Sequence, residues 1–181
     1  MRIALLGGSF NPPHLGHVLN ACHVLAAHRV DRIWLMPVYR HAFDKALAPF
    51  DVRCELCERA IAPFAARMAV TRVEQEVAPG SRTVDVLDHL LPRHPDDEFS
   101  LVLGSDLLGE VHLWKAFDRI EQMVRIIVVP RAGYPDPRAQ GPVLPEVSST
   151  LIRQMLARGE DPGALLPNGV RDYLREHPIY R

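Results

Sequence analysis

The chain has 181 residues, a length that suits one domain with its own apolar core, and we take residues 1–181 as that domain. Its 21 Lys and Arg residues are balanced by 22 Asp and Glu residues, so no surplus of positive charge favours binding to DNA or RNA. The start of the chain lacks the features of a secretory signal, and no apolar stretch is as long as a membrane span. We therefore expect a cytoplasmic protein that binds neither nucleic acid nor a membrane.

Short apolar runs alternate with segments of helical periodicity along the chain. In the first helical segment, apolar side chains recur every three or four residues from Leu15 to Ala26, which is the spacing of one helix face. The expected strands are residues 3–6, 32–38, 68–73, 99–104 and 125–130. The further expected helices are residues 51–62, 83–91, 117–123, 148–158 and 168–175. Strands that are apolar on both faces and alternate with helices predict a Rossmann-like α/β fold, doubly wound around a mostly parallel sheet.

Residues 133–145 interrupt this alternation. The segment contains four prolines and two glycines, which preclude regular structure, and we expect a loop there. At its end, Val143 and Leu144 are candidates for a short last strand before the helix that begins near Ser148.

Three cysteines are too few for a disulfide framework, and their odd number favours free thiols in a reducing compartment. Cys54 and Cys57 form a C-x-x-C pair, but it lies in the middle of a helical pattern. A redox pair would lie at a helix start, and a zinc site would need further ligands. We expect all three, including Cys22, to pack as small apolar residues. A redox or metal protein built on the pair is an alternative that a zinc assay would test.

The stretch GGSFNPPHLGH, residues 7–17, lies between the first strand and the first helix. In an open parallel sheet, ligands bind beyond the carboxyl ends of the strands. The glycines leave room for phosphates to approach the backbone, and the prolines lead into a helix start whose free N–H groups attract anions. His14 and His17 are three residues apart, so both rings can face one ligand. The stretch indicates a phosphate site, although it matches neither the dinucleotide fingerprint nor the Walker A motif.

The whole stretch closely resembles the H-x-G-H signature of the nucleotidyltransferase superfamily, and GGSFNPPH resembles its nicotinate mononucleotide adenylyltransferase branch. A second motif of that family, S-S-T-x-x-R, matches residues 148–153, which alone would be an ordinary helix cap. Residues 81–90, 101–108 and 128–135 and the end of the chain resemble further family segments in the same order.

This resemblance implies transfer of the AMP part of ATP to nicotinate mononucleotide, giving deamido-NAD and pyrophosphate in NAD biosynthesis. The phosphate of the mononucleotide would attack the α-phosphorus of ATP in line. Because that nucleophile is already an anion, it needs no general base, and the protein has to position the reactants and neutralise charge. Mg²⁺ should come with ATP, held mostly by phosphates and water.

The resemblance also implies roles on the ATP side of the site. His14 and His17 would contact the triphosphate, and Arg153 would complete the catalytic set. Ser149 and Thr150, together with Arg153, would hold the β and γ phosphates. The other residues expected to bind ATP are Gly8, Ser9 and Phe10 at the α-phosphate, Gly16, and Gly104 and Asp106 beside the ribose and adenine.

On the acceptor side, Trp114 follows the G-x-D element at a distance like that of the family's ring-stacking tryptophan, although such a residue is also commonly a core residue. Thr83 would lie near the carboxylate or amide of the pyridine. Lys45 or Arg40 would take the phosphate of the mononucleotide, and Arg131 is a further expected substrate-binding residue.

The chain departs from the family pattern at two places, and the identity of the acceptor mononucleotide therefore stays open. The chain reads PVYRHAFDK where the family often has P-P-H-K, and Arg82 replaces a tyrosine of the S-Y-T segment. Enzymes that prefer nicotinamide mononucleotide or, more distantly, phosphopantetheine are alternatives; GGSFNPPH and Trp114 favour a pyridine. A nucleotide-binding sensor without catalysis is the alternative from another class, but all three expected catalytic residues are present. Whether the chain forms a homo-oligomer stays open.

Overall fold

The computed structural model describes residues 1–40, 47–78 and 80–180, and a sheet of five strands forms its centre. The strands are β1 (Arg2–Gly8), β2 (Arg32–Pro37), β3 (Met68–Val70), β4 (Glu98–Gly104) and β5 (Arg125–Val129). They lie in the order β3-β2-β1-β4-β5, and every neighbouring pair is parallel. The chain thus builds from β1 to one edge and then from β4 to the other, which confirms the predicted doubly wound, Rossmann-like fold.

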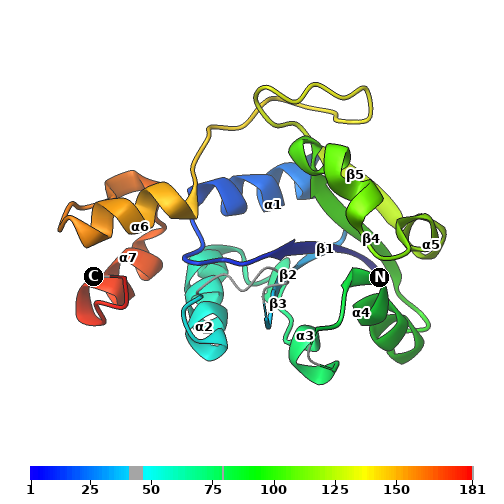
Figure 1. Ribbon diagram of the computed structural model, residues 1–181, viewed down its shortest axis with the longest axis horizontal. Coiled ribbons are helices and arrows are strands. Elements are labelled where there is room, and N and C mark those ends of the chain that lie inside the picture. Colours follow the sequence, from blue (N-terminus) through cyan, green and yellow to red (C-terminus); the bar gives the residue numbers. More distant parts are fainter. Residues whose placement is uncertain (41–46, 79, 181) are drawn as a thin grey trace.

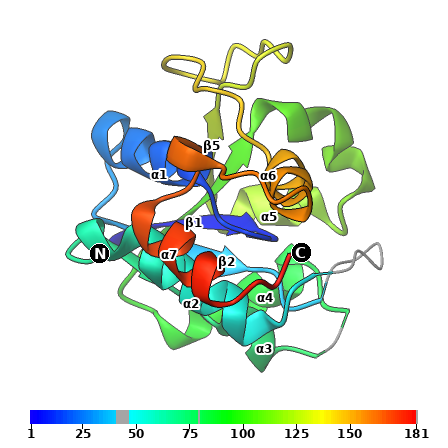
Figure 2. The same ribbon diagram turned by 90° about the vertical axis from the view of Figure 1, so that its left-hand side faces the viewer.

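Helices cover both faces of the sheet. One face carries α1 (Leu15–Ala27), α2 (Phe50–Ile61), α6 (Ser149–Ala157) and α7 (Asn168–Glu176), whose apolar side chains share a core cluster. The other face carries α3 (Val73–Glu76), α4 (Thr83–Leu90) and α5 (Phe117–Met123), which share a second cluster. In both views α7 lies beside α2 (Figure 1, Figure 2), so the end of the chain returns to a helix close to the sheet.

Strand β1 separates these two clusters. Ala4 and Leu6 belong to the first cluster, Ile3 and Leu5 to the second, and none of the four is more than 7% exposed. Because successive side chains of a strand point to opposite faces, a strand covered on both sides must be apolar throughout. The strand order reverses between β1 and β4, so the loops that follow these two strands lie where ligands bind in such sheets.

The boundaries differ in detail from the sequence prediction. β1 continues through Gly7 and Gly8, which pair with Met36 and Pro37 of β2, so the loop begins only at Ser9. Helix α3 and the nine-residue 3-10 helix η3 (Ser105–Leu113) were not predicted.

The predicted strand at Val143 and Leu144 is wrong, because both residues lie in irregular chain. Prolines flank the pair and have no N–H to donate to a sheet, and Val143 is 56% exposed. The segment between β5 and α6 instead forms the expected loop, which arches outward from the rest of the chain in both views (Figure 1, Figure 2). Among the described residues, no helix combines the length and apolar character needed to cross a membrane.

The C-x-x-C pair lies on the buried side of α2. Cys54 and Cys57 are both 0% exposed, and Cys57 belongs to the first core cluster. Burial raises the pKa of both thiols, which disfavours the reactive thiolate. Cys22 is also a free thiol and packs against the same cluster. The prediction that these residues pack as small apolar side chains is confirmed.

Candidate active site

The loop between β1 and α1 makes a tight turn at Phe10. Phe10 has a φ angle of 45°, in the left-handed region, and its side chain is 1% exposed. For a residue with a side chain this conformation costs about 1 kcal/mol, so the surroundings must hold it. A methyl group on Gly8 would come within 3.3 Å of the Phe10 ring. Gly8 therefore makes room for this ring, a neighbour that the sequence alone did not reveal.

His14 and His17 lie side by side at the start of α1, with ring centroids 3.7 Å apart. The backbone N–H of His14 donates to Nδ1 of His17 at 3.1 Å. An N–H can only donate, so Nδ1 is unprotonated and a neutral His17 ring carries its proton on Nε2. The ring of Phe10 packs 4.7 Å from that of His17. The loop thereby fixes the tautomer of His17 and leaves Nε2 as its donor.

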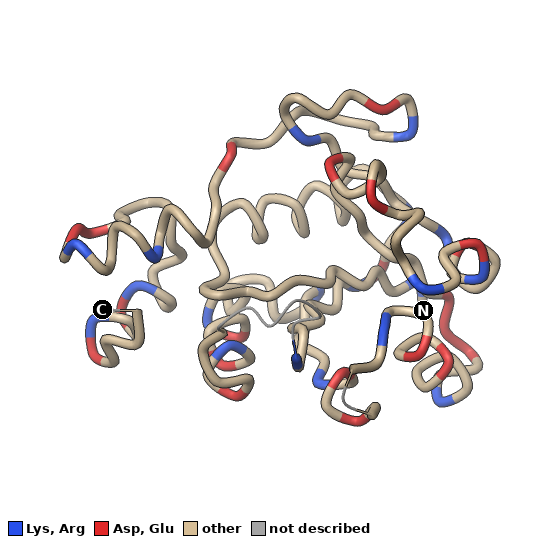
Figure 3. Tube along the Cα trace, in the orientation of Figure 1, with Lys and Arg blue, Asp and Glu red and all other residues tan. Residues whose placement is uncertain are grey.

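Both imidazoles are neutral at pH 7 in the unliganded protein. Burial, together with the nearby Arg131 guanidinium, lowers the pKa of His14 to about 4. Burial also lowers the pKa of His17 well below its usual range, with added repulsion from His14 and Arg131. Helix α1 contains no Lys, Arg, Asp or Glu (Figure 3), so its own side chains supply no fixed charge. An arriving polyanion would favour protonation and oppose the effect of burial.

His14 is 5% exposed, and its buried Nδ1 has no hydrogen-bond partner within the described chain. Leaving such an atom unpaired costs about 1–3 kcal/mol, so this atom favours a hydrogen bond from a ligand or water. Gly16 explains how the ring fits. A methyl group on Gly16 would lie 3.1 Å from the His14 ring and 3.6 Å from Cβ of Val147.

The first turn of α6 is bonded to the same loop. Ser149 Oγ donates to the Pro12 carbonyl at 2.9 Å, and Arg153 Nη1 donates to the Asn11 carbonyl at 2.7 Å. Arg153 Nη2 also donates to Thr150 Oγ1 at 3.2 Å. The structure therefore brings together the beginnings of α1 and α6, which are 137 residues or more apart along the chain at these contacts. Two helix starts side by side offer unpaired backbone N–H groups and positive dipole ends.

The ends of β4 and β5 contribute an acidic and a basic side chain. Arg131 Nε lies 3.7 Å from Asp106 Oδ1, and neither of these buried atoms has a hydrogen-bond partner in the described residues. The backbone N–H of Arg131 donates to Ser105 Oγ at 2.9 Å. A side chain on Gly104 would collide with the Asp106 carboxylate and approach Arg131 Nε. The positive charge of Arg131 also lowers the pKa of both histidines.

The predicted acceptor residues lie in a second group. Thr83 is the first residue of α4, and Trp114 directly follows η3. Lys115 Nζ bonds to Asp85 Oδ1 at 2.6 Å, which ties the residue after Trp114 to the first turn of α4. Trp114 is half-buried, and its ring packs edge to face with Phe117 at 5.9 Å. Trp114 therefore has both a packing contact and an exposed part that a ligand can reach.

Lys45 and Arg40 were predicted as alternative contacts for the phosphate of the mononucleotide. Lys45 lies outside the described residues. Arg40 is exposed, and its guanidinium lies 5.9 Å from the centre of the Tyr39 ring.

Sequence reasoning missed three residues that hold the loop from within: Asn11, Arg53 and Tyr180. Arg53 is 1% exposed and donates to the carbonyls of Ser9, Val38 and Ala48. Asn11 Oδ1 accepts from the Tyr180 hydroxyl at 2.8 Å and from the Ala48 N–H at 3.0 Å. The sequence did contain a sign that Arg53 is buried, because it occupies a position on the apolar face of α2.

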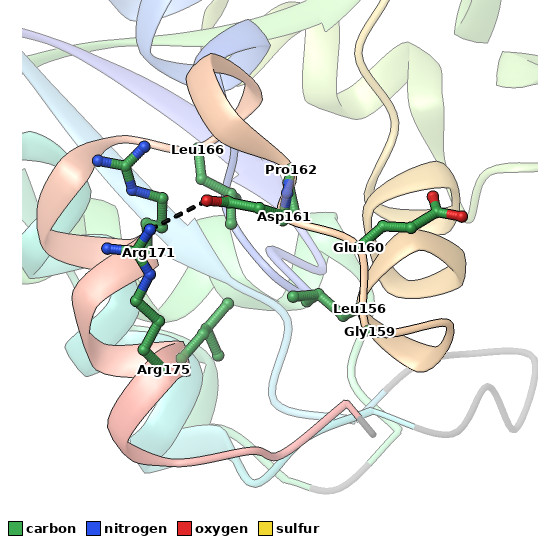
Figure 4. Close-up of a pocket in the computed structure, with 9 residues that line it drawn as sticks. Leu156, Gly159, Glu160, Asp161, Pro162, Leu166, Arg171 and Arg175 are labelled. Atoms are coloured by element: carbon green, nitrogen blue, oxygen red, sulfur yellow. Dashed lines mark hydrogen bonds and ion pairs between the residues drawn. The ribbon is translucent and has the colours of Figure 1, made fainter.

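A separate cavity of about 120 Å³ lies between the end of α6 and α7 (Figure 4). Leu156 and Leu166 line it with Arg171, Arg175 and Asp161, and Arg175 pairs with Asp161 at 2.9 Å. Ligand pockets usually measure about 300 Å³ or more, so this cavity is too small for a mononucleotide. None of the residues that line it was predicted as a site residue.

The described residues contain no group of three or more His, Cys, Asp or Glu side chains placed to hold a metal ion.

Known proteins are similar to this chain over almost its whole length. Residues 5–155 match the cytidylyltransferase-like family. A protein of Myxococcus xanthus named probable nicotinate-nucleotide adenylyltransferase is 48% identical, and the match covers 99% of this chain and 95% of the relative. A protein of the same name from Anaeromyxobacter dehalogenans is 46% identical, over 99% of this chain and 97% of the relative.

A solved structure shares the fold. Plasmodium falciparum nicotinic acid mononucleotide adenylyltransferase, complexed with NaAD, has a TM-score of 0.81 at 19% identity, covering 99% of this chain and 97% of that one. That likeness concerns the fold, whereas the two bacterial relatives are similar enough in sequence to establish the family. The chain belongs to the cytidylyltransferase-like family and, among nucleotidyltransferases, to the nicotinate-nucleotide adenylyltransferases.

Proposed function

We propose that this protein transfers the AMP part of ATP to nicotinate mononucleotide, with deamido-NAD and pyrophosphate as products. An oxygen of the mononucleotide phosphate forms a bond to the α-phosphorus. The bond from that phosphorus to the bridging oxygen breaks in line, and pyrophosphate leaves with the electron pair. The family relatives carry this activity in their name, and the protein's three free cysteines, two of them buried, suit the reducing cytoplasm.

One observation carries the proposal: Ser149 and Arg153 of α6 are bonded to Pro12 and Asn11, directly before the paired histidines of α1. This contact puts two helix starts and several N–H donors around one loop. Such a surface suits a triphosphate, whose three linked phosphates need donors from more than one side. We assign the β and γ phosphates to the α6 side, and the α-phosphate to the backbone of Ser9 and Phe10.

The imidazoles act as fixed donors in this mechanism. His17 carries its proton on Nε2 when neutral, because its Nδ1 accepts from the backbone. As pyrophosphate leaves, negative charge grows on its oxygens, and a donor already in place stabilises that charge without reorganisation. Arg131 adds a positive charge close to both rings. No proton has to be removed from the nucleophile, because the attacking phosphate is already ionised.

ATP enters as its magnesium complex, and the metal ion neutralises part of the charge on the phosphates. For the second substrate, the pyridine ring stacks on Trp114 and its carboxylate lies toward Thr83 at the start of α4. The half-burial of Trp114 supports this assignment, since part of its aromatic side chain stays accessible to a ligand.

The experiment that tests the function supplies ATP and Mg²⁺ with nicotinate mononucleotide, nicotinamide mononucleotide or phosphopantetheine, and measures pyrophosphate release. We expect the highest kcat/KM with nicotinate mononucleotide. A variant that lacks both rings, His14→Ala with His17→Ala, serves as the inactive control. Preference for phosphopantetheine would contradict the proposal. Binding of ATP without release of its pyrophosphate, when either pyridine mononucleotide is supplied, would also contradict it.

A further inference from the structure

Arg53 lies on the buried face of α2, outside both sequence motifs of the site. It is among the largest fully buried side chains of the described protein, at 1% exposure. Arginine is almost never buried to this degree unless its charge is paired. Here the guanidinium donates to three backbone carbonyls and thereby connects the segments to which they belong.

These carbonyls belong to three separate segments. Nη1 donates to Ser9 at 2.9 Å in the loop after β1, and Nη2 donates to Val38 at 2.7 Å, directly after β2. Nε donates to Ala48 at 2.9 Å, just before α2. All three segments lie at the carboxyl edge of the sheet, where the ligand is expected. One side chain thus fixes the distances between them.

We propose that Arg53 is a positioning residue for adenylyl transfer, which holds the loop at residues 9–11 in its reactive shape; this inference rests on the proposed function. The peptide between Ser9 and Phe10 is trans, so its carbonyl and N–H point in opposite directions. Because Arg53 holds the Ser9 carbonyl on the buried side, the Phe10 N–H points away from the guanidinium. The bond also secures the left-handed turn at Phe10.

A second buried contact secures the same loop. Asn11 Oδ1 accepts from the hydroxyl of Tyr180 at 2.8 Å and from the N–H of Ala48 at 3.0 Å. Ala48 therefore donates to Asn11 and accepts from Arg53, which joins the two contacts. Burial raises the pKa of the Tyr180 hydroxyl, so it remains a donor throughout the neutral range. Tyr180 extends the same support from the end of the chain to the loop.

The geometry distinguishes arginine from lysine at this position. A guanidinium presents several N–H groups in a rigid, flat fork and can reach carbonyls in three directions. An ammonium keeps the positive charge but concentrates its donors on one atom. Arg53→Lys therefore preserves the charge and loses most of the connections between segments. The matched control is Arg59→Lys, the same change on the same helix at an exposed arginine that pairs with Glu55.

The test measures kcat and both KM values for these variants with ATP and nicotinate mononucleotide, together with thermal unfolding. We expect Arg53→Lys to lower kcat about 10- to 100-fold, because small displacements of positioned groups cost this much. The value of kcat should fall by a larger factor than either KM rises, because a positioning residue acts on the transition state more than on ground-state binding. Arg59→Lys should keep the wild-type kcat.

Two further variants separate positioning from folding. Arg53→Ala leaves space for a small guanidinium compound, and ethylguanidinium at millimolar concentration should restore part of kcat, whereas urea should not. Tyr180→Phe removes one hydroxyl and should lower kcat several-fold, whereas Tyr173→Phe on α7 should not.

A wild-type kcat in Arg53→Lys, or a loss of kcat that follows thermal stability and is not rescued by ethylguanidinium, would overturn the inference while the proposed function stands. Wild-type protein is measured in the same assay. If it forms no dinucleotide, the proposed function fails, and this inference fails with it.

Discussion

Replacing His14 by glutamine should make the protein less sensitive to acid. The folded protein holds the pKa of His14 at about 4, against 6.5 for an unperturbed histidine. Between these values the unfolded chain binds a proton that the folded site does not accept. Stability therefore falls as the pH decreases from about 6.5 to about 4, and the loss is complete only below the folded pKa. Glutamine does not titrate and so removes this contribution.

The two pKa values give the size of the effect. The difference of about 2.5 units corresponds to about 3 kcal/mol in total. The part lost by pH 6 is about 0.8 kcal/mol, and the part lost by pH 5 is about 2 kcal/mol. His17 adds a loss of the same sign in both proteins. Because His14 helps to lower the His17 pKa, the difference between wild type and His14→Gln measures His14 together with its effect on His17.

Urea unfolding of both proteins at about pH 7.5, 6 and 5 measures this difference. We expect the free energy of unfolding of wild type to fall by about 2 kcal/mol more than that of the variant between the first and last pH. Equal pH dependence in the two proteins would refute the reasoning, because it would mean that the His14 ring takes up a proton in the folded state as readily as in the unfolded chain.

Three further predictions concern the reaction. His17→Ala should lower kcat about 100-fold and leave the Kd of ATP within about threefold, with His23→Ala on the same helix as the control; an unchanged kcat would contradict the role of His17. Trp114→Ala should raise the KM for the mononucleotide about three- to tenfold and leave that for ATP nearly unchanged, and equal changes in both would argue against stacking. Gly104→Ala should raise the KM for ATP because its methyl group displaces Asp106 and Arg131, whereas Gly109→Ala, which meets nothing within 4 Å, should not; the same KM in both variants would show that this crowding is without effect.

Local pattern was sufficient to predict the central strands and most helices. β1 and β4 are apolar on both faces, and α5 coincides with the predicted residues 117–123. Where the pattern is ambiguous, the boundaries shifted. Gly7 and Gly8 are typical of a loop, yet they extend β1 because the backbone of β2 continues beside them. A glycine carries no side chain from which such pairing can be inferred.

In the site, too, contacts between residues close in sequence could be predicted, whereas contacts between distant segments could not. The pairing of His14 with His17 was predicted from their spacing on one helical turn. In the structure His14 is the extended N-cap residue and only His17 lies within α1, yet the two rings still lie side by side. The bond between Tyr180 and Asn11 joins residues 169 apart, and no local pattern contains it. Arg53 was missed for another reason: a charged residue in an apolar stripe indicates burial, but the carbonyls that pair with it belong to distant segments.

The central claim is that the triphosphate of ATP lies between the two imidazoles of α1 and the first turn of α6. A crystal structure with magnesium and an ATP analogue that cannot transfer its adenylyl group tests this most directly. We predict that Nε2 of His17 lies within about 3.2 Å of a phosphate oxygen, and that Ser149 and Arg153 flank the terminal phosphates. A triphosphate bound away from both helix starts, or imidazoles that contact only protein in the complex, would contradict the claim.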